Sequence, residues 1–151
     1  MRAQEIMSAD PCYCGESCTT QMAAQLMRQW NIGALPIVDN GFRRKLVGVV
    51  TDRDLCLRVV AEGRDPGQVI VRECMSREAV CCRPEDEVVD ALRLMREHHV
   101  RRLPVLDGDG VLAGMVSLTD LVRCKAVGAE ELMSAMTRVC EAGAEPAHRA
   151  A

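Results

Sequence analysis

Apolar and polar positions along the chain alternate with two periods, one typical of helices and one typical of strands. Apolar residues at spacings of three and four predict helices over residues 20–30 and 85–98. The second helix is expected to begin just after Pro84, because acidic residues follow this proline and favour the first turn of a helix. Short apolar runs then predict strands over residues 103–106 and 111–116.

The pattern occurs twice, which makes the repeat the strongest signal in the sequence. Glu5-x-Met7-Ser8 recurs as Glu73-x-Met75-Ser76, and Leu35-Pro36-x-Val38-Asp39 recurs as Leu103-Pro104-x-Leu106-Asp107, at a shift of 68 residues (75 − 7). Gly48-Val49-Val50-Thr51-x-x-Asp54 recurs as Gly114-Met115-Val116-Ser117-x-x-Asp120, at a shift of 66 residues (114 − 48). A hairpin loop is therefore two residues longer in the first copy.

Each copy reads as helix, strand, strand, helix, after a short extended stretch near Cys12 or Val80. Neither copy can bury its strands alone, so the two copies are expected to pack together through their sheets. The expected organisation is a first repeat over residues 1–62, a connection over 63–72, a second repeat over 73–127, and a C-terminal helix with a mobile tail over 128–151. The predicted fold class is α+β.

Composition and charge narrow the possible partners. Aromatic residues make up 2% of the chain and the formal net charge is −3, so neither a base-stacking platform nor a broad positive field for nucleic acid is expected. No apolar run approaches the roughly 20 residues that span a bilayer. The N-terminal residues lack the apolar core of a secretory signal, so a cytoplasmic location is expected.

Nine cysteines are present, an odd number in a chain long enough to form a core without disulfides. Most are therefore expected to be small buried hydrophobic residues. Cys12, Cys14 and Cys18 have a spacing that could gather thiolates on a metal ion, although no histidine lies nearby. With Cys81 and Cys82 they support an alternative hypothesis, a thiol-based redox or zinc sensor.

The repeated Gly-h-h-(Thr/Ser)-x-x-Asp element, in which h is apolar, carries the candidate chemistry. Glycine permits close approach of another chain or a ligand, and a hydroxyl at a helix start favours an anion. A carboxylate one turn further on, Asp54 or Asp120, can accept hydrogen bonds from a ribose diol. The alternative is structural, because Thr51 and Ser117 followed three residues later by an acid also match a helix-capping pattern.

The motif Met-x-x-x-h-x-x-Leu-Pro-h-h-Asp, turn, Gly-h-h-(Thr/Ser)-x-x-Asp resembles that of CBS domains. The resemblance covers residues 3–125, and the chain is similar to stand-alone bacterial CBS-pair proteins, also called Bateman modules. It implies two β-α-β-β-α repeats with clefts between them that bind adenosyl compounds. In such families the terminal Asp holds the ribose, the Thr or Ser contacts phosphate, and apolar residues enclose the adenine.

The resemblance also singles out arginines. Val100-Arg101-Arg102-Leu103-Pro104 resembles the His-Arg-Leu-Pro segment of the regulatory gamma subunit of AMP-activated protein kinase, in which the arginine reaches phosphate. The first copy has Gly33-Ala34 there and carries Arg53 where the second copy has Thr119. The alternative for each arginine is a solvated side chain or a salt bridge. The expected ligand-binding residues are Cys12, Pro36, Thr51, Arg53, Asp54, Val80, Arg101, Arg102, Pro104, Ser117, Thr119 and Asp120.

The remaining features have structural interpretations. The pair His98-His99 is expected to cap a helix, and Met22, Met27 and Met95 are expected to lie in the core. One apolar helix face is expected to comprise Leu132, Met133, Met136, Val139 and Cys140.

No catalytic set is visible in the sequence. The predicted function is therefore non-catalytic: a regulatory homodimer that senses AMP, ADP, ATP or S-adenosylmethionine for an unidentified effector protein. A structural adaptor without a ligand is the second alternative.

Overall fold

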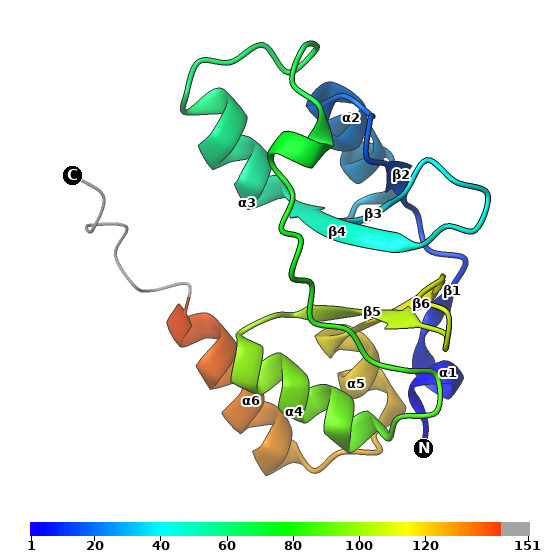
Figure 1. Cartoon of the computed structure of the whole chain (residues 1–151). Helices are drawn as coiled ribbons and strands as arrows, with labels where there is room; N and C mark the ends of the chain where they lie inside the picture. Colours follow the sequence, from blue (N-terminus) through cyan, green and yellow to red (C-terminus); the bar gives the residue numbers. More distant parts are fainter. Residues whose placement is uncertain (143–151) are drawn as a thin grey trace. The chain divides into compact units, whose positions relative to one another are not determined.

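The computed structural model describes residues 1–142, which form two compact units (Figure 1). Unit 1 comprises Met1–Ala9, Val80–Val105 and the chain from Gly114 onward, and unit 2 comprises Asp10–Ala79 and Leu106–Ala113. The predicted tail beyond residue 142 lies outside the described residues. Within residues 1–142, no helix is both long and apolar enough to cross a membrane.

Unit 2 is built on a three-stranded sheet in the order β2-β3-β4. Strand β2 runs parallel to β3, and β3 runs antiparallel to β4. Figure 1 shows helices α2 and α3 on the same side of β3 and β4. The elements of this unit are β2 (Cys14–Gly15), α2 (Thr20–Trp30), β3 (Ala34–Val38), β4 (Leu46–Thr51), α3 (Asp52–Leu55), a π-helical continuation (Cys56–Val60) and a short 3-10 helix (Val71–Glu73).

Helix α2 has the bounds that the sequence predicts. The Thr19 side chain caps its start by accepting a hydrogen bond from the Met22 backbone N–H at 3.2 Å, and the helix ends where Asn31 turns left-handed at φ 50°. Ala23 and Met27 are buried, but Met22 is 50% exposed. The expectation that Met22 is a core residue was wrong, because it lies beside the buried stripe of the helix and not on it.

Unit 1 also has a three-stranded sheet, in the order β1-β6-β5, in which the short strand lies beside β6, the counterpart of β4. Strand β1 pairs antiparallel with β6, and Cys82 forms a parallel bridge to Val105 of β5, as β2 does to β3. Figure 1 shows α4, α5 and α6 on the same side of β5 and β6. The elements are α1 (Ala3–Ile6), β1 (Ser8–Ala9), α4 (Val88–His98), β5 (Arg102–Leu106), β6 (Leu112–Ser117), α5 (Leu118–Cys124) and α6 (Ala129–Ala142), with the hairpin tip of β5 and β6 assigned to unit 2.

Helix α4 starts three residues later than the sequence analysis predicted. The acidic residues after Pro84 form a turn: the Asp86 carboxylate accepts a hydrogen bond from the Arg83 backbone N–H at 2.8 Å, and the Asp86 N–H donates to the Arg83 carbonyl. The helix therefore begins at Val88. The repeat itself contained the correct start, because Val88 corresponds to Thr20 at the shift of 68 residues.

The end of α4 agrees with the prediction of a histidine cap. His99 adopts the left-handed conformation at φ 55°, and its N–H donates to the Met95 carbonyl. The Nδ1 atom of His99 also lies 3.0 Å from the carbonyl oxygen of Arg138 in α6. This contact joins the two helices at the place where α4 ends.

The predicted C-terminal helix is present as α6 and packs against α4. Its buried side chains are Ala135 and Val139, with Leu132 half-buried. Met133, Met136 and Cys140, which belong to the same predicted apolar face, are exposed. The helix is anchored by fewer and smaller residues than the apolar pattern suggested.

The two glycines of the repeated motif each accommodate a close backbone contact within their unit. A Cβ atom on Gly48 would lie 2.6 Å from the carbonyl oxygen of Ser76, and one on Gly114 would lie 2.9 Å from that of Ser8. Ser76 pairs with β4, and Ser8 pairs with β6. The Met-Ser motif of each repeat copy therefore packs on β4 or β6 of the other copy. This close approach of the Met-Ser backbone explains why glycine is needed at residues 48 and 114.

Candidate functional site

The turn between β4 and α3 holds the first candidate pair, Thr51 and Asp54. The Thr51 hydroxyl accepts a hydrogen bond from the Asp54 N–H at 3.1 Å, and Asp54 Oδ2 accepts one from the Thr51 N–H at 2.9 Å. Both residues are half-buried. The capping arrangement that the sequence left open is therefore present in unit 2.

Unit 1 repeats this arrangement with Ser117 and Asp120. Asp120 Oδ2 accepts hydrogen bonds from the Ser117 N–H at 2.8 Å and from its hydroxyl at 2.5 Å, while the Asp120 N–H donates to the Ser117 Oγ at 3.2 Å. In each pair a single carboxylate oxygen makes the cap. Within residues 1–142, the second oxygen of Asp54 and of Asp120 accepts no hydrogen bond, so each carboxylate keeps acceptor capacity.

The predicted adenine-facing residues have the same degree of burial at equivalent positions in the two units. Pro36 on β3 and Pro104 on β5 are buried, while Cys12 and Val80 are half-buried and pack against the apolar core of their own unit. The Pro104 carbonyl accepts a hydrogen bond from the Cys82 N–H at 3.0 Å. The predicted residues of the first copy all lie in unit 2, and those of the second copy all lie in unit 1.

The candidate phosphate-binding arginines form no ion pair within the described part of the chain. Arg102 is half-buried at the start of β5, and Arg101 is exposed. The Arg101 carbonyl accepts a hydrogen bond from the Leu118 N–H at 2.9 Å, which places residue 101 beside the start of α5. Arg53 and Thr119 occupy equivalent exposed positions in the first turns of α3 and α5. The salt-bridge alternative therefore does not apply to the three arginines within residues 1–142.

Unit 2 has a carboxylate where unit 1 has an arginine. The Gly33 carbonyl accepts a hydrogen bond from the Asp52 N–H at 3.0 Å, the counterpart of the bond between Leu118 and Arg101. A Cβ atom on Gly33 would lie only 3.0 Å from Asp52 Oδ2. The Asp52 carboxylate therefore lies beside the position that a side chain at residue 33 would occupy. Asp52 was not among the ligand-binding residues expected from the sequence, although the repeat alignment places it opposite Leu118, where an uncharged residue stands in the second copy.

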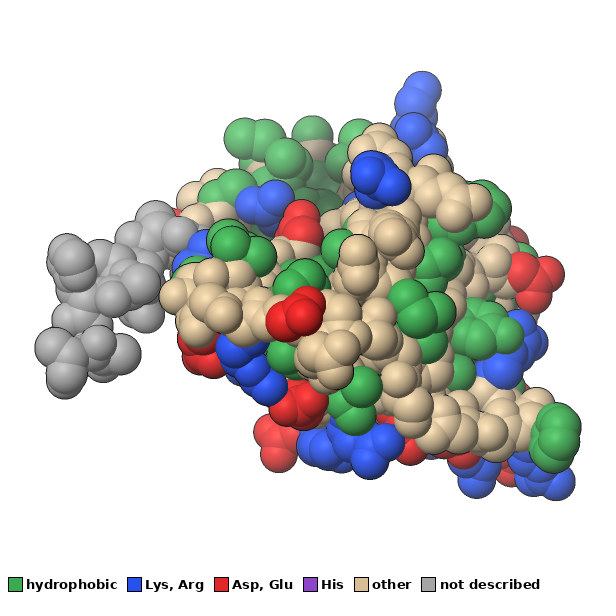
Figure 2. Space-filling model, turned by 90° about the horizontal axis from the view of Figure 1, so that it is seen from above, with side chains coloured by type: hydrophobic (Ala, Val, Ile, Leu, Met, Phe, Trp, Pro, Cys, Tyr) green, Lys and Arg blue, Asp and Glu red, His purple; other side chains and the backbone are tan. Residues whose placement is uncertain are grey.

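The charged side chains on the face drawn in Figure 2 are mixed. Lysine and arginine side chains stand in small separate groups, with acidic side chains between them. Any favourable charge for a ligand phosphate on this face is therefore local, set by individual residues.

Two thiols of the cysteine cluster, those of Cys12 and Cys14, are harder to deprotonate than ordinary thiols. Burial, followed by the neighbouring Cys18, raises the pKa of Cys14 to about 12, and burial raises the pKa of Cys12. Residues 1–142 contain no group of three His, Cys, Asp or Glu side chains arranged to hold a metal ion.

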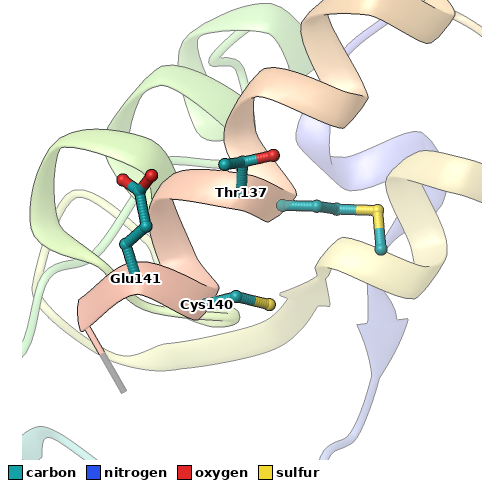
Figure 3. Close-up of a pocket in the computed structure, with 4 residues that line it drawn as sticks. Thr137, Cys140 and Glu141 are labelled. Carbon is teal, nitrogen blue, oxygen red and sulfur yellow. The ribbon is translucent and has the colours of Figure 1, made fainter. Parts of the chain in front are cut away.

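A shallow hollow of about 430 Å³ lies on unit 1, lined by Met136, Thr137, Cys140 and Glu141 of α6. Figure 3 shows Thr137 and Cys140 projecting from the same side of this helix. None of the predicted ligand-binding residues lines it. The hollow is therefore separate from the candidate site.

The sequence and fold agree with those of known proteins. A family model described as "CBS domain" matches residues 3–61 and 71–126, and the chain belongs to this family. It is 45% identical over 121 residues to the CBS domain-containing protein YhcV of Bacillus subtilis, covering 80% of this chain and 82% of YhcV. Two further relatives are matched over only 50% and 54% of their own length.

Solved structures of CBS proteins share the fold. Hypoxic Response Protein I with two coordinated zinc ions has a TM-score of 0.73 at 36% identity, covering 82% of this chain and 98% of that one. The CBS domain pair of protein MJ0100 with 5′-methylthioadenosine and S-adenosyl-L-methionine has a TM-score of 0.72 at 26% identity, covering 82% and 98%. CBSX2 in complex with AMP has a TM-score of 0.69 at 26% identity, covering 82% and 94%.

Proposed function

We propose that this protein is a non-catalytic regulatory sensor, built from CBS repeats over residues 1–62 and 73–127, that binds an adenosyl compound at each repeated strand-to-helix turn. The observation that carries the proposal is the equivalence of Asp54 and Asp120. Each uses one oxygen to cap its own helix and leaves the other without a partner among residues 1–142. A carboxylate held in this way has its acceptor oriented before a ribose diol arrives.

The other predicted residues complete the proposed site. Thr51 and Ser117 lie where each would contact a phosphate if the ligand carries one, Pro36 and Pro104 border the adenine, and the unpaired arginines supply positive charge. The adenosyl ligands of the similar CBS pair of MJ0100 and of CBSX2 support this class of ligand. Signalling requires that the ligand bind one conformation or one assembly more tightly than another. Association as a homodimer belongs to the same proposal and is tested by light scattering with and without ligand.

Thermal unfolding with AMP, ADP, ATP and S-adenosylmethionine tests the ligand class. A ligand at 100 times its Kd adds about 2.7 kcal/mol to the free energy of unfolding, so at least one of the four is expected to raise the Tm. No rise with any of them would overturn the proposal.

The double variant Asp54→Asn/Asp120→Asn tests the site. Asparagine keeps an oxygen that can accept the capping hydrogen bond, whereas alanine would also cost about 0.5–2 kcal/mol through loss of the cap. The double variant is expected to lose the ligand-induced rise in Tm. Asp86→Asn is the matched control, because Asp86 accepts the same kind of backbone hydrogen bond, from Arg83, outside the proposed site. Equal rises in the double variant and the control would dismiss the ribose role.

A further inference from the structure

At the equivalent backbone bond beside the strand-to-helix turn, unit 1 has a basic side chain and unit 2 has an acidic one. In unit 1, Arg101 lies beside the turn that carries Asp120, and its carbonyl is bonded to the Leu118 N–H at 2.9 Å. In unit 2 the same backbone bond joins Gly33 and Asp52 at 3.0 Å. The backbone is therefore equivalent, and the difference lies in the side chains: an arginine with a leucine in one unit, a glycine with an aspartate in the other.

The Asp52 carboxylate is held at this position. Its Oδ2 lies 3.0 Å from where the Cβ of residue 33 would be, and its Oδ1 accepts a hydrogen bond from the Arg53 N–H at 2.8 Å. No salt bridge neutralises Asp52 within the described residues, and the Arg53 guanidinium forms none either. The acid thus remains an unpaired negative charge beside the proposed ligand position of unit 2.

We infer that the two proposed sites differ in ligand class: unit 1 takes a phosphorylated adenosine such as AMP, and unit 2 takes an adenosine derivative without a phosphate. This rests on the proposed function. A phosphate monoester carries about −1.5 to −2 charge at neutral pH. Arg101 and Arg102 attract it in unit 1, and a guanidinium can hold it in a forked contact.

In unit 2 the same phosphate meets Asp52, with Arg53 the only cation among residues 51–54. Asp52 is exposed, and like charges a few ångströms apart near a protein surface repel strongly enough to weaken binding by about tenfold or more. An uncharged adenosine avoids this repulsion and keeps the ribose contact with Asp54. A cationic adenosyl compound would gain from Asp52.

Isothermal titration with two probes, AMP and adenosine, tests the inference. Wild-type protein is expected to bind one AMP per chain with high affinity and to bind adenosine at both sites. Asp52→Leu, which copies Leu118, is expected to strengthen AMP binding at the second site by about tenfold. Arg101→Gly, which copies Gly33, is expected to weaken the single strong AMP site.

Glu62→Leu is the control for charge, since it removes one exposed acid of unit 2 that is not among the neighbours of the Gly33 position, which are all Asp52 atoms. It is expected to leave AMP binding unchanged. Two equal AMP sites in the wild-type protein, or equal effects of Asp52→Leu and Glu62→Leu, would overturn the inference and leave the proposed function standing. Binding of neither AMP nor adenosine would overturn the inference at its foundation, and S-adenosylmethionine in the thermal series would then decide the proposed function separately.

Discussion

Units 1 and 2 have equivalent strands, helices and capping hydrogen bonds, but they differ in the charged side chains beside the strand-to-helix turn and in the presence of α6. The capping pairs Thr51–Asp54 and Ser117–Asp120 have matching geometry. Among residues 1–142, α6 belongs to unit 1, and unit 2 has an acid, Asp52, at the position where unit 1 has Leu118. The repeated sequence therefore determines the equivalent strands, helices and capping pairs, while the chemistry of each site depends on a few side chains outside the shared motif.

The largest expected effect tests whether the two cores are equivalent. Leu35 and Leu103 occupy the same repeat position and are both 0% exposed. Leu35→Ala and Leu103→Ala should each lower the free energy of unfolding by about 2–5 kcal/mol through lost burial and a cavity. Urea unfolding measures this. A loss in only one variant would break the equivalence.

Glycine substitutions sharpen the comparison of the two close backbone contacts. Gly48→Ala should cost about 1–3 kcal/mol, because the new Cβ would meet the Ser76 carbonyl oxygen. Gly114→Ala should cost less, because its new Cβ would lie 2.9 Å from the Ser8 carbonyl oxygen against 2.6 Å for Gly48 and Ser76, and the nearest atom, the Met7 sulfur, is on a flexible side chain. Adding Met7→Ala to Gly114→Ala should therefore relieve the new contact with sulfur. An equal or larger loss in Gly114→Ala than in Gly48→Ala, measured by urea unfolding, would contradict this account.

Helix α6 gives unit 1 a covering that unit 2 does not have among the described residues. Val139 is 4% exposed in α6, whereas Met22 is 50% exposed in α2. Val139→Ala is expected to lower the free energy of unfolding by about 1–2 kcal/mol, and Met22→Ala by less than about 0.5 kcal/mol. Thermal unfolding of both variants checks this. Equal losses would mean that α6 contributes no packing.

The smallest effect concerns pH. Burial is the main cause that raises the pKa of both Cys14 and Cys82 to about 12, above the ordinary 9.0. As the pH rises, these thiols lose their protons in the unfolded chain before they do so in the folded protein. Their contribution to the free energy of unfolding is therefore fully present below pH 9 and is lost as the pH rises towards 12. Denaturant unfolding at pH 8 and pH 10 measures the fall. It should be shallower in Cys14→Ala and Cys82→Ala than in the exposed control Cys56→Ala.

The repeat alignment predicted most of the helices, strands and capping pairs, because equivalent residues adopt equivalent conformations. It could not show that each Met-Ser segment packs on the other copy, since alignment does not reveal which copy a segment contacts. The start of α4 was predicted too early because the acidic residues before Val88 fit a turn as well as a helix. The proximity of Asp52 to Gly33 also required the fold, because these residues are far apart in sequence and meet only through the pairing of β3 with β4.

The affinity for AMP of Asp54→Asn, measured beside that of Asp120→Asn, tests the central claim most directly. We expect Asp120→Asn to bind AMP at least about tenfold more weakly than the wild type, because it loses a charge-assisted contact with the ribose. Asp54→Asn should keep the wild-type affinity at the strong site. Equal losses in the two variants, or a loss confined to Asp54→Asn, would contradict the account.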